Sequence, residues 1–173
     1  RTGETLYHSS HDNVVTAAAP STAQIEAMVT KLRTQKGPGG LANVIGQPRI
    51  LFVPEAYRAQ ALEVIESTTA VGAAASTSTR DGNANRPNTV RRYNLMVLAD
   101  PRFDEASSTD YHLTTDPNSS DTIIIGTLNG QDAPMLEEED MWSTDGVSFK
   151  VRMDAVARAL QYRNFVKSGS ASA

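Results

Sequence analysis

Apolar side chains recur at helical spacing in residues 21–36, directly after Pro20. The positions that form this stripe are Ile25, Met28, Val29 and Leu32. Ser21 precedes Gln24 by three residues, the spacing of a capping box at a helix N-terminus. The Gly-Pro-Gly-Gly run at residues 37–40 ends the pattern, because these residue types disfavour continued helix. Residues 21–36 are therefore predicted to form an amphipathic helix.

A strand and a second helix are predicted next. Residues 49–53 form a short apolar run typical of a buried strand, and Pro54 and Glu55 are favoured in the first turn of a helix. Residues 55–66 then place apolar side chains along one helical stripe. Its members are Tyr57, Ala61, Leu62, Val64 and Ile65. This order predicts a strand followed by a helix that packs against a sheet.

Residues 67–92 differ in composition, because Thr, Ala, Ser, Gly and Asn predominate and few large apolar side chains occur. Asp81-Gly82 and Arg86-Pro87 are turn signals within this stretch. A segment of this composition has little to bury, so a mobile loop is predicted. A loop of this length in a compact domain is typical of a binding surface or of disorder.

The pattern beyond this loop favours strands, at residues 93–99, 109–113 and 122–128. Asn129-Gly130 is a strong hairpin signal, and it predicts that the last of these strands turns back toward Met135 and Leu136.

Strict alternation follows in residues 147–154. Apolar Val147, Phe149, Val151 and Met153 alternate with polar side chains such as Lys150 and Arg152. This period of two predicts a half-buried strand whose apolar side faces the core. Phe149→Ala is accordingly expected to cost about 3 kcal/mol or more. Residues 155–167 fit a helix or a strand, and periodicity alone leaves both open.

Composition narrows the class of protein. The chain of 173 residues is long enough for one domain, although its apolar share of 39% and aromatic share of 6% predict a lean core. A formal charge of −4 counts against a dedicated nucleic-acid binder. Cysteine is absent, which excludes disulfides and Cys-based metal sites. No apolar run reaches the roughly 20 residues of a membrane span.

The best candidate for chemistry is the cluster of His8, His11 and Asp12, where two imidazoles and a carboxylate lie within one turn. They would suit a small metal-dependent hydrolase, with His112 as a further ligand only if the fold brought it close. The alternative is a polar turn whose side chains cap local backbone groups. Too few ligands are specified nearby, so no metal, cofactor or catalytic residue is assigned.

The other motifs give weaker evidence for a catalytic or binding site. The acidic run of residues 137–140 lacks the opposed placement of catalytic carboxylates, and no Gly-x-Ser-x-Gly nucleophile motif occurs. A set of basic and aromatic side chains has the residue types that contact phosphates and bases, but salt bridges explain its cations equally well. The set is Arg91, Arg92, Tyr93, Arg158, Tyr162, Arg163, Phe165 and Lys167.

Several segments resemble the major capsid proteins of tailed bacteriophages, in particular the Mu-like major head subunits and the prohead protease–major capsid fusions. Residues 145–154 resemble that family's "DGVxFKVRxD" signature, which residues 162–167 continue. Residues 100–104 are similar to its "DPRLD" segment, and residues 43–54 to its "NVxPxxLLVP" segment. Residues 25–36 are similar to its "AMRxQK" helix, and residues 6–13 to its entry motif. The matches are collinear and leave only residues 67–92 without a counterpart.

The resemblance implies an α+β chain with the Hong Kong 97-like capsid fold. Residues 1–173 would form a single capsid-type domain, with about 15–140 resembling the axial domain. Residues from about 141–173 would be strands returning to the peripheral domain, so the ambiguous tail would be a strand. The arm, extended loop and spine helix of that fold would lie upstream. Residues 67–92 would meet around the symmetry axes.

The resemblance also implies the function: a structural, non-enzymatic subunit that self-assembles into an icosahedral shell around the genome. Its partners would be other copies of itself in hexamers and pentamers, with a scaffold or prohead protease, and no membrane or specific nucleic-acid sequence. The protein would be made in the bacterial cytoplasm and end in the virion. The metal-dependent hydrolase and a tailspike-like adhesin are the alternatives. By itself the chain is expected to be a monomer or small oligomer at micromolar concentration.

Overall fold

The computed structural model describes residues 4–37, 39–41, 47–70, 87–143 and 145–171. The chain divides into two compact units. Unit 1 combines residues 1–122 with 161–173, and unit 2 comprises residues 123–160. Both contain strands and the helices belong to unit 1, so the α+β class is confirmed. Residue 140, near which the resemblance placed a boundary, lies inside unit 2. The last strand of the chain, by contrast, pairs within the sheet of unit 1.

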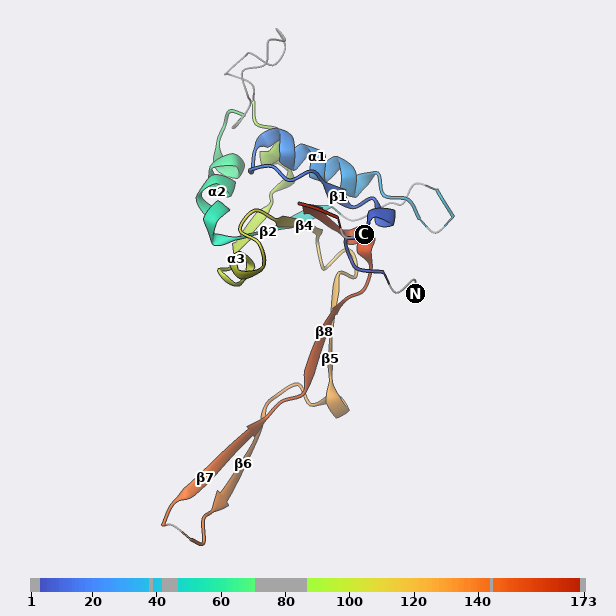
Figure 1. Ribbon diagram of the computed structural model, residues 1–173. Coiled ribbons are helices and arrows are strands. Elements are labelled where there is room, and N and C mark those ends of the chain that lie inside the picture. The colour runs from blue at the N-terminus through green and yellow to red at the C-terminus, as the bar shows by residue number, and fades with distance from the viewer. Residues whose placement is uncertain (1–3, 38, 42–46, 71–86, 144, 172–173) are drawn as a thin grey trace. The chain divides into compact units, whose positions relative to one another are not determined.

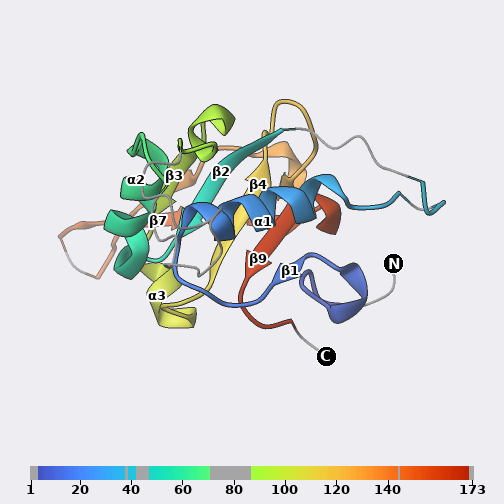
Figure 2. The same cartoon turned by 90° about the horizontal axis from the view of Figure 1, so that it is seen from above.

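A five-stranded mixed sheet in the order β1-β9-β4-β2-β3 organises unit 1 (Figure 2). Its strands are β1 (Val14–Val15), β2 (Pro48–Val53), β3 (Met96–Ala99), β4 (Tyr111–Thr115) and β9 (Phe165–Ser168). β1 runs parallel to β9 and β3 runs parallel to β2, whereas β4 is antiparallel to both of its neighbours. The two ends of the chain therefore meet at one side of the sheet.

The first predicted helix is confirmed as α1 (Thr22–Arg33). The Ser21 hydroxyl accepts a hydrogen bond from the Gln24 N–H at 3.2 Å, which satisfies one free donor at the helix start. The Gln24 side chain does not complete the capping box. Its amide donates instead to the Thr16 carbonyl at 2.7 Å and to the Ser168 hydroxyl at 3.1 Å.

The predicted strand and helix after residue 48 are also confirmed. Helix α2 (Arg58–Glu66) starts later than expected, because a 3₁₀ turn, Glu55–Tyr57, precedes it. The Asp104 carboxylate accepts a hydrogen bond from the Glu55 N–H at 2.9 Å and so caps this turn from helix α3 (Arg102–Ala106). That cap comes from a distant segment, which explains why the local pattern did not reveal it.

One hydrophobic core lies in unit 1, between the sheet and the helices α1 and α2. Leu51, Leu113 and Val166 come from adjacent central strands and pair across the sheet. The helices contribute most of the remaining members, which include Ile25, Met28, Val29, Leu32, Ala61 and Val64. Each of these side chains is at most 2% exposed, so the lean composition still yields a dry core.

Both described ends of the 67–92 segment are held by hydrogen bonds. Asn88 donates from its amide to the carbonyls of Val64 (2.5 Å) and Ser67 (3.0 Å), and a 3₁₀ turn, Val90–Tyr93, precedes β3. This turn explains why β3 begins later than the predicted residue 93. Residues 71–86 lie outside the described residues, so the predicted mobile loop stays a prediction.

Unit 2 consists of two antiparallel pairs of strands (Figure 1). β5 (Ile123–Thr127) pairs with β8 (Ala155–Ala159), and β6 (Met135–Asp140) pairs with β7 (Val147–Arg152). The predicted hairpin at Asn129-Gly130 is wrong. Both residues adopt the positive φ of such a turn, at 56° and 71°, but β5 pairs with β8 and the chain continues into β6.

The strand predicted from the alternation in residues 147–154 is present, but its apolar side chains do not pack into a core. Phe149 is 64% exposed and Val151 is 66% exposed, so the expected half-burial is wrong. In fact none of the described residues of unit 2 is buried. The alternation requires two different faces, and it does not require that either face be covered within the same chain. The ambiguous tail forms strands, β8 and β9, as the family resemblance implied.

Candidate assembly surface

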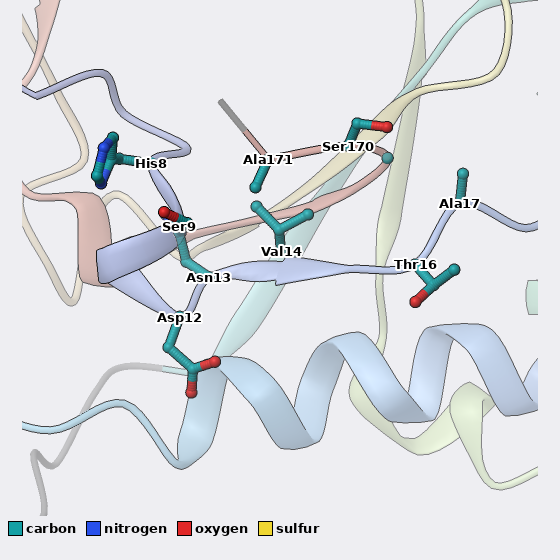
Figure 3. A pocket seen from close by; sticks show the side chains of 10 residues that line it. His8, Ser9, Asp12, Asn13, Val14, Thr16, Ala17, Ser170 and Ala171 are labelled. Atoms are coloured by element: carbon teal, nitrogen blue, oxygen red, sulfur yellow. The ribbon is translucent and has the colours of Figure 1, made fainter. Parts of the chain in front are cut away.

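The His8 and His11 rings both approach the Glu4 carboxylate, with nitrogen–oxygen distances of 3.9 Å and 3.2 Å, but the Asp12 side chain does not join them. His8 Nδ1 lies 2.8 Å from the Ser10 hydroxyl, and His11 Nδ1 lies 3.2 Å from the Leu6 carbonyl. The Asp12 carboxylate pairs with Lys31 Nζ at 2.5 Å, and Figure 3 shows it directed toward α1 rather than toward the His8 ring. This arrangement is the polar turn that the sequence left open as the alternative.

A pocket of about 390 Å³ adjoins this turn beside strand β1 (Figure 3). It is lined by His8, Ser9, Asp12, Asn13, Val14, Thr16, Ala17, Gly169, Ser170 and Ala171. His8 and Asp12 both line it, but on the described part of the chain no group of three metal-ligating side chains is found. The pocket therefore offers polar backbone and small side chains without the ligand set that a metal-dependent hydrolase requires.

His112 packs against the segment that leads into this turn, but its ring contacts Tyr7 and Phe103 rather than His8, His11 or Asp12. Its ring stacks on Tyr7 at 5.1 Å and lies 6.0 Å from the Phe103 ring, measured between ring centroids. Burial, together with the charge of Lys167, lowers the pKa of His112 to about 4. Its Nδ1 has no hydrogen-bond partner among the described residues. A neutral imidazole in an aromatic setting is a packing residue here.

The candidate phosphate contacts are also dispersed. Tyr162 stacks on His11 at a centroid distance of 4.0 Å, and Phe165 is only 5% exposed, so neither ring is free to stack on a base. Lys167 pairs with Asp110 at 2.8 Å, and Arg163 donates to the Lys36 carbonyl at 2.6 Å. Arg91, Arg92 and Arg158 stay exposed, and of these three Arg91 and Arg92 are adjacent in the sequence.

The exposed surface of unit 2 is the remaining candidate for a functional site. Within it, the β6–β7 pair has two faces of different composition. Cross-strand partners share a face, and successive pairs alternate between faces. One face, here called the polar face, holds Met135, Glu137, Glu139, Ser148, Lys150 and Arg152. The other, here called the acidic–apolar face, holds Leu136, Glu138, Asp140, Val147, Phe149 and Val151.

The polar face pairs one of its carboxylates with a lysine on the neighbouring strand. Glu137 and Lys150 are direct partners across the strands and form an ion pair at 3.1 Å. The hydrogen bond from Lys150, together with its positive charge, lowers the pKa of the Glu137 carboxyl. The Arg152 guanidinium lies 4.0 Å from the Met135 sulfur. These contacts are those of a face that tolerates water.

The β5–β8 pair carries a face with no charge at all. Ile123, Ile125 and Thr127 of β5 alternate outward on the same side as their partners on β8. Those partners are Ala159, Ala157 and Ala155. Ile123 is 53% exposed and Ile125 is 70% exposed, so large aliphatic groups stand beside small ones on an open surface. Such an apolar surface suits packing against another element.

Two-stranded ribbons are marginally stable in water, and most of their strength comes from packing an apolar face. Unit 2 exposes many large apolar side chains, among them Ile123, Ile124, Ile125, Leu128, Leu136, Trp142, Val147, Phe149, Val151, Val156 and Leu160. Exposure of so many large apolar side chains is typical of a surface that another element or molecule covers. The sequence showed the alternation in β7, but it could not show that no second apolar layer folds over it.

Within the described residues, no helix is long and apolar enough to cross a membrane. No curated protein matches the chain. The family described as phage capsid protein matches residues 2–168, which is nearly the whole chain. A structural role, an assembly with other capsid copies and a place in the virion accord with an open apolar ribbon and with the absence of a convergent site among the described residues. The chain belongs to the phage capsid protein family.

Proposed function

We propose that this protein is a non-enzymatic subunit of a closed icosahedral shell around a phage genome. Its fold would be of the Hong Kong 97-like type, within the Mu-like and prohead protease–capsid fusion group that the sequence resembles. Unit 1 would then correspond to the axial domain and unit 2 to part of the peripheral domain. Copies would meet as hexamers and pentamers, with a scaffold or prohead protease as further partners.

The observation that carries the proposal is the contrast between the packed core of unit 1 and the coreless strands of unit 2. A catalytic protein needs a preorganised site, and two candidate carboxylates of this chain, Asp12 and Asp110, are engaged in ion pairs with Lys31 and Lys167. A shell subunit needs surfaces that are completed by neighbours. The exposed apolar faces of unit 2 meet that requirement. A metal-dependent hydrolase would need a set of metal ligands, and no group of three metal-ligating side chains is found among the described residues.

Expression of the whole gene in a bacterial host, followed by negative-stain electron microscopy of the pelletable fraction, tests the proposal. Closed particles of uniform diameter are expected. A variant in which residues 123–160 are replaced by a short Gly-Ser linker should give none, while unit 1 keeps its circular dichroism spectrum. A variant with Glu105→Ala, an exposed change in α3, serves as the matched control and should assemble. Absence of particles from the unaltered gene would overturn the proposed function.

A further inference from the structure

The formal charge of the chain is divided unequally between its two units. Residues 123–160 hold seven acidic and three basic side chains, a formal charge of −4 that equals the charge of the whole chain. Unit 1 is thus formally neutral, with 13 residues of each sign. A negative ribbon and a neutral body suggest that the ribbon meets a positive region on some other surface.

The negative charge of the β6–β7 pair is unpaired on the acidic–apolar face. Glu138 stands opposite Phe149, and Asp140 stands opposite Val147, so neither has a cationic cross-strand partner. Among the described residues neither carboxylate forms an ion pair, in contrast to Glu137 on the polar face. This face therefore presents carboxylates beside exposed aromatic and aliphatic groups. A partner surface must supply cations next to apolar side chains.

Unit 1 carries such cations around the turn Val90–Tyr93. This turn, together with Arg33, Arg49, Arg91 and Arg92, is called the arginine turn. Arg91 and Arg92 lie exposed in the turn itself. The Arg33 guanidinium carbon lies 5.5 Å from the centroid of the Tyr93 ring, and Arg49 donates to the Asn94 carbonyl at 3.1 Å. None of these four arginines forms an ion pair within the described ranges.

Among the described residues, Glu26 brings a carboxylate to the arginine turn, and this carboxylate is already engaged. Glu26 accepts hydrogen bonds from the hydroxyls of Thr89 and Tyr93, the latter at 2.9 Å. One negative charge against four guanidinium groups leaves the turn positive. The turn also leads directly into β3, an edge strand of the sheet on which Met96 is 47% exposed and Leu98 is 39% exposed. Cations and apolar side chains are thus neighbours along this part of unit 1.

We propose that the acidic–apolar face of one copy docks on the arginine turn and strand β3 of a second copy. This inference rests on the proposed function, and it names the surfaces that one capsid contact uses. Glu138 and Asp140 would meet Arg91 and Arg92, while Phe149 and its neighbours would cover Met96 and Leu98. The two surfaces differ, so the contact is heterologous and each copy can offer both halves to different neighbours. Opposite charges fix the register, and apolar groups supply the buried area.

Charge reversal on each side tests the docking. One variant carries Glu138→Arg and Asp140→Arg, and the other carries Arg91→Glu and Arg92→Glu. Sedimentation velocity of the 173-residue chain is measured from micromolar to near-millimolar concentration at low salt. Each variant alone should associate at least about tenfold more weakly than the unaltered chain. An equimolar mixture of the two should recover association, because each reversed surface then meets its complement.

A matched control separates the face from the charge. Glu139→Arg changes the same charge on the same strand as Glu138→Arg, but on the polar face. It should leave association within about twofold of the unaltered chain, whereas Glu138→Arg alone should weaken it about threefold or more. Recovery in the mixture also excludes misfolding as the cause of the loss, because a misfolded variant is not repaired by a second one.

Other outcomes overturn the inference. If association survives both charge reversals, or if the unaltered chain stays monomeric throughout the concentration range, the proposed contact is wrong. The proposed function would still stand if the whole gene forms shells. Recovery only when all four substitutions share one chain would place the contact within a single copy. Loss of binding to a DNA duplex in Arg91→Glu/Arg92→Glu, with association unchanged, would make the arginine turn a nucleic-acid site instead.

Discussion

Unit 1 encloses its large apolar side chains, and unit 2 displays them. In unit 1 the sheet and two helices share a core in which Leu51, Leu113 and Val166 are completely buried. In unit 2 the described residues form two strand ladders, and none of their side chains is buried. The hydrogen bonds of a ladder satisfy the backbone but contribute little net stability alone. Unit 1 therefore has a core of its own, and we expect unit 2 to gain stability from contacts with other copies.

The largest expected difference between the units concerns truncation of apolar side chains. Leu113→Ala in the core should lower the free energy of unfolding by about 3 to 4 kcal/mol, since it leaves a cavity between sheet and helices. Leu136→Ala, the same chemical change on the 63% exposed position in β6, should lower it by less than about 0.5 kcal/mol. Urea denaturation of the isolated chain measures both. Equal losses would show that unit 2 has a core of its own.

The same reasoning revises the effect of Phe149→Ala. The sequence pattern predicted a loss typical of a core phenylalanine, but the exposed position in β7 predicts almost none in the isolated chain. The loss should instead be seen in association between copies, where Phe149 would be covered. Sedimentation and denaturation of this one variant therefore separate folding from assembly.

A second difference concerns pH, because the buried titratable imidazole lies in unit 1. The pKa of His112 is held at about 4, below its ordinary value of 6.5, by burial and by Lys167, with Asp110 opposing them. Between these values the unfolded chain takes up a proton that the folded chain refuses, so the stability of unit 1 falls as the pH falls from about 6.5 to about 4. The loss should reach about 2 to 3 kcal/mol at the acidic end.

His112→Phe serves as the control for this pH effect. The substitution keeps an aromatic ring between Tyr7 and Phe103 and removes the titrating group. Denaturation curves at several pH values should show a shallower acid dependence for the variant than for the unaltered chain. An identical slope in both would mean that another group is responsible.

A smaller effect is expected at the start of α1. Ser21→Ala removes the side-chain acceptor for the Gln24 N–H and should cost about 1 kcal/mol. Ser21→Asn, which keeps a capping oxygen, should restore most of that loss. Thermal denaturation of both variants measures the difference. A cost equal for both substitutions would indicate that packing rather than the cap stabilises this end of the helix.

Patterns confined to one element were predictable, and partners distant in sequence were not. The α1 stripe, the strand and helix around Pro54, and the strand character of residues 147–152 follow from local spacing. The hairpin at Asn129-Gly130 failed because the local turn geometry is present while the pairing partner of β5 is β8, which lies 28 residues or more along the chain. Local signals specify a turn, but they do not specify which strands it joins.

The candidate site divides in the same way. The His8, His11 and Asp12 cluster was visible in the sequence, but the ion pair with Lys31 that occupies Asp12 depends on the packing of α1. The alternation in β7 was visible too, yet whether an apolar face is covered depends on every other element. The arginine turn needed the fold most, because Arg33 and Arg49 reach Tyr93 and Asn94 from separate elements.

The single tryptophan offers a minor optical test of the comparison. Trp142, between β6 and β7, is fully exposed, so its emission in the isolated chain should resemble that of tryptophan in water. Association that covers this end of the ribbon should shift the emission to shorter wavelength. An unchanged spectrum in assembled material would restrict the contact to other parts of unit 2.

Hydrogen–deuterium exchange, followed by mass spectrometry on the isolated chain and on assembled particles, tests the central claim most directly. In the isolated chain the amides of residues 123–160 should exchange rapidly, because their ladders open without disrupting a core, while those of β2, β4 and α1 stay protected. In particles, protection should rise strongly throughout residues 123–160. In unit 1 it should rise only at residues that contact another copy. Equally rapid exchange of residues 123–160 in both states would contradict the central claim.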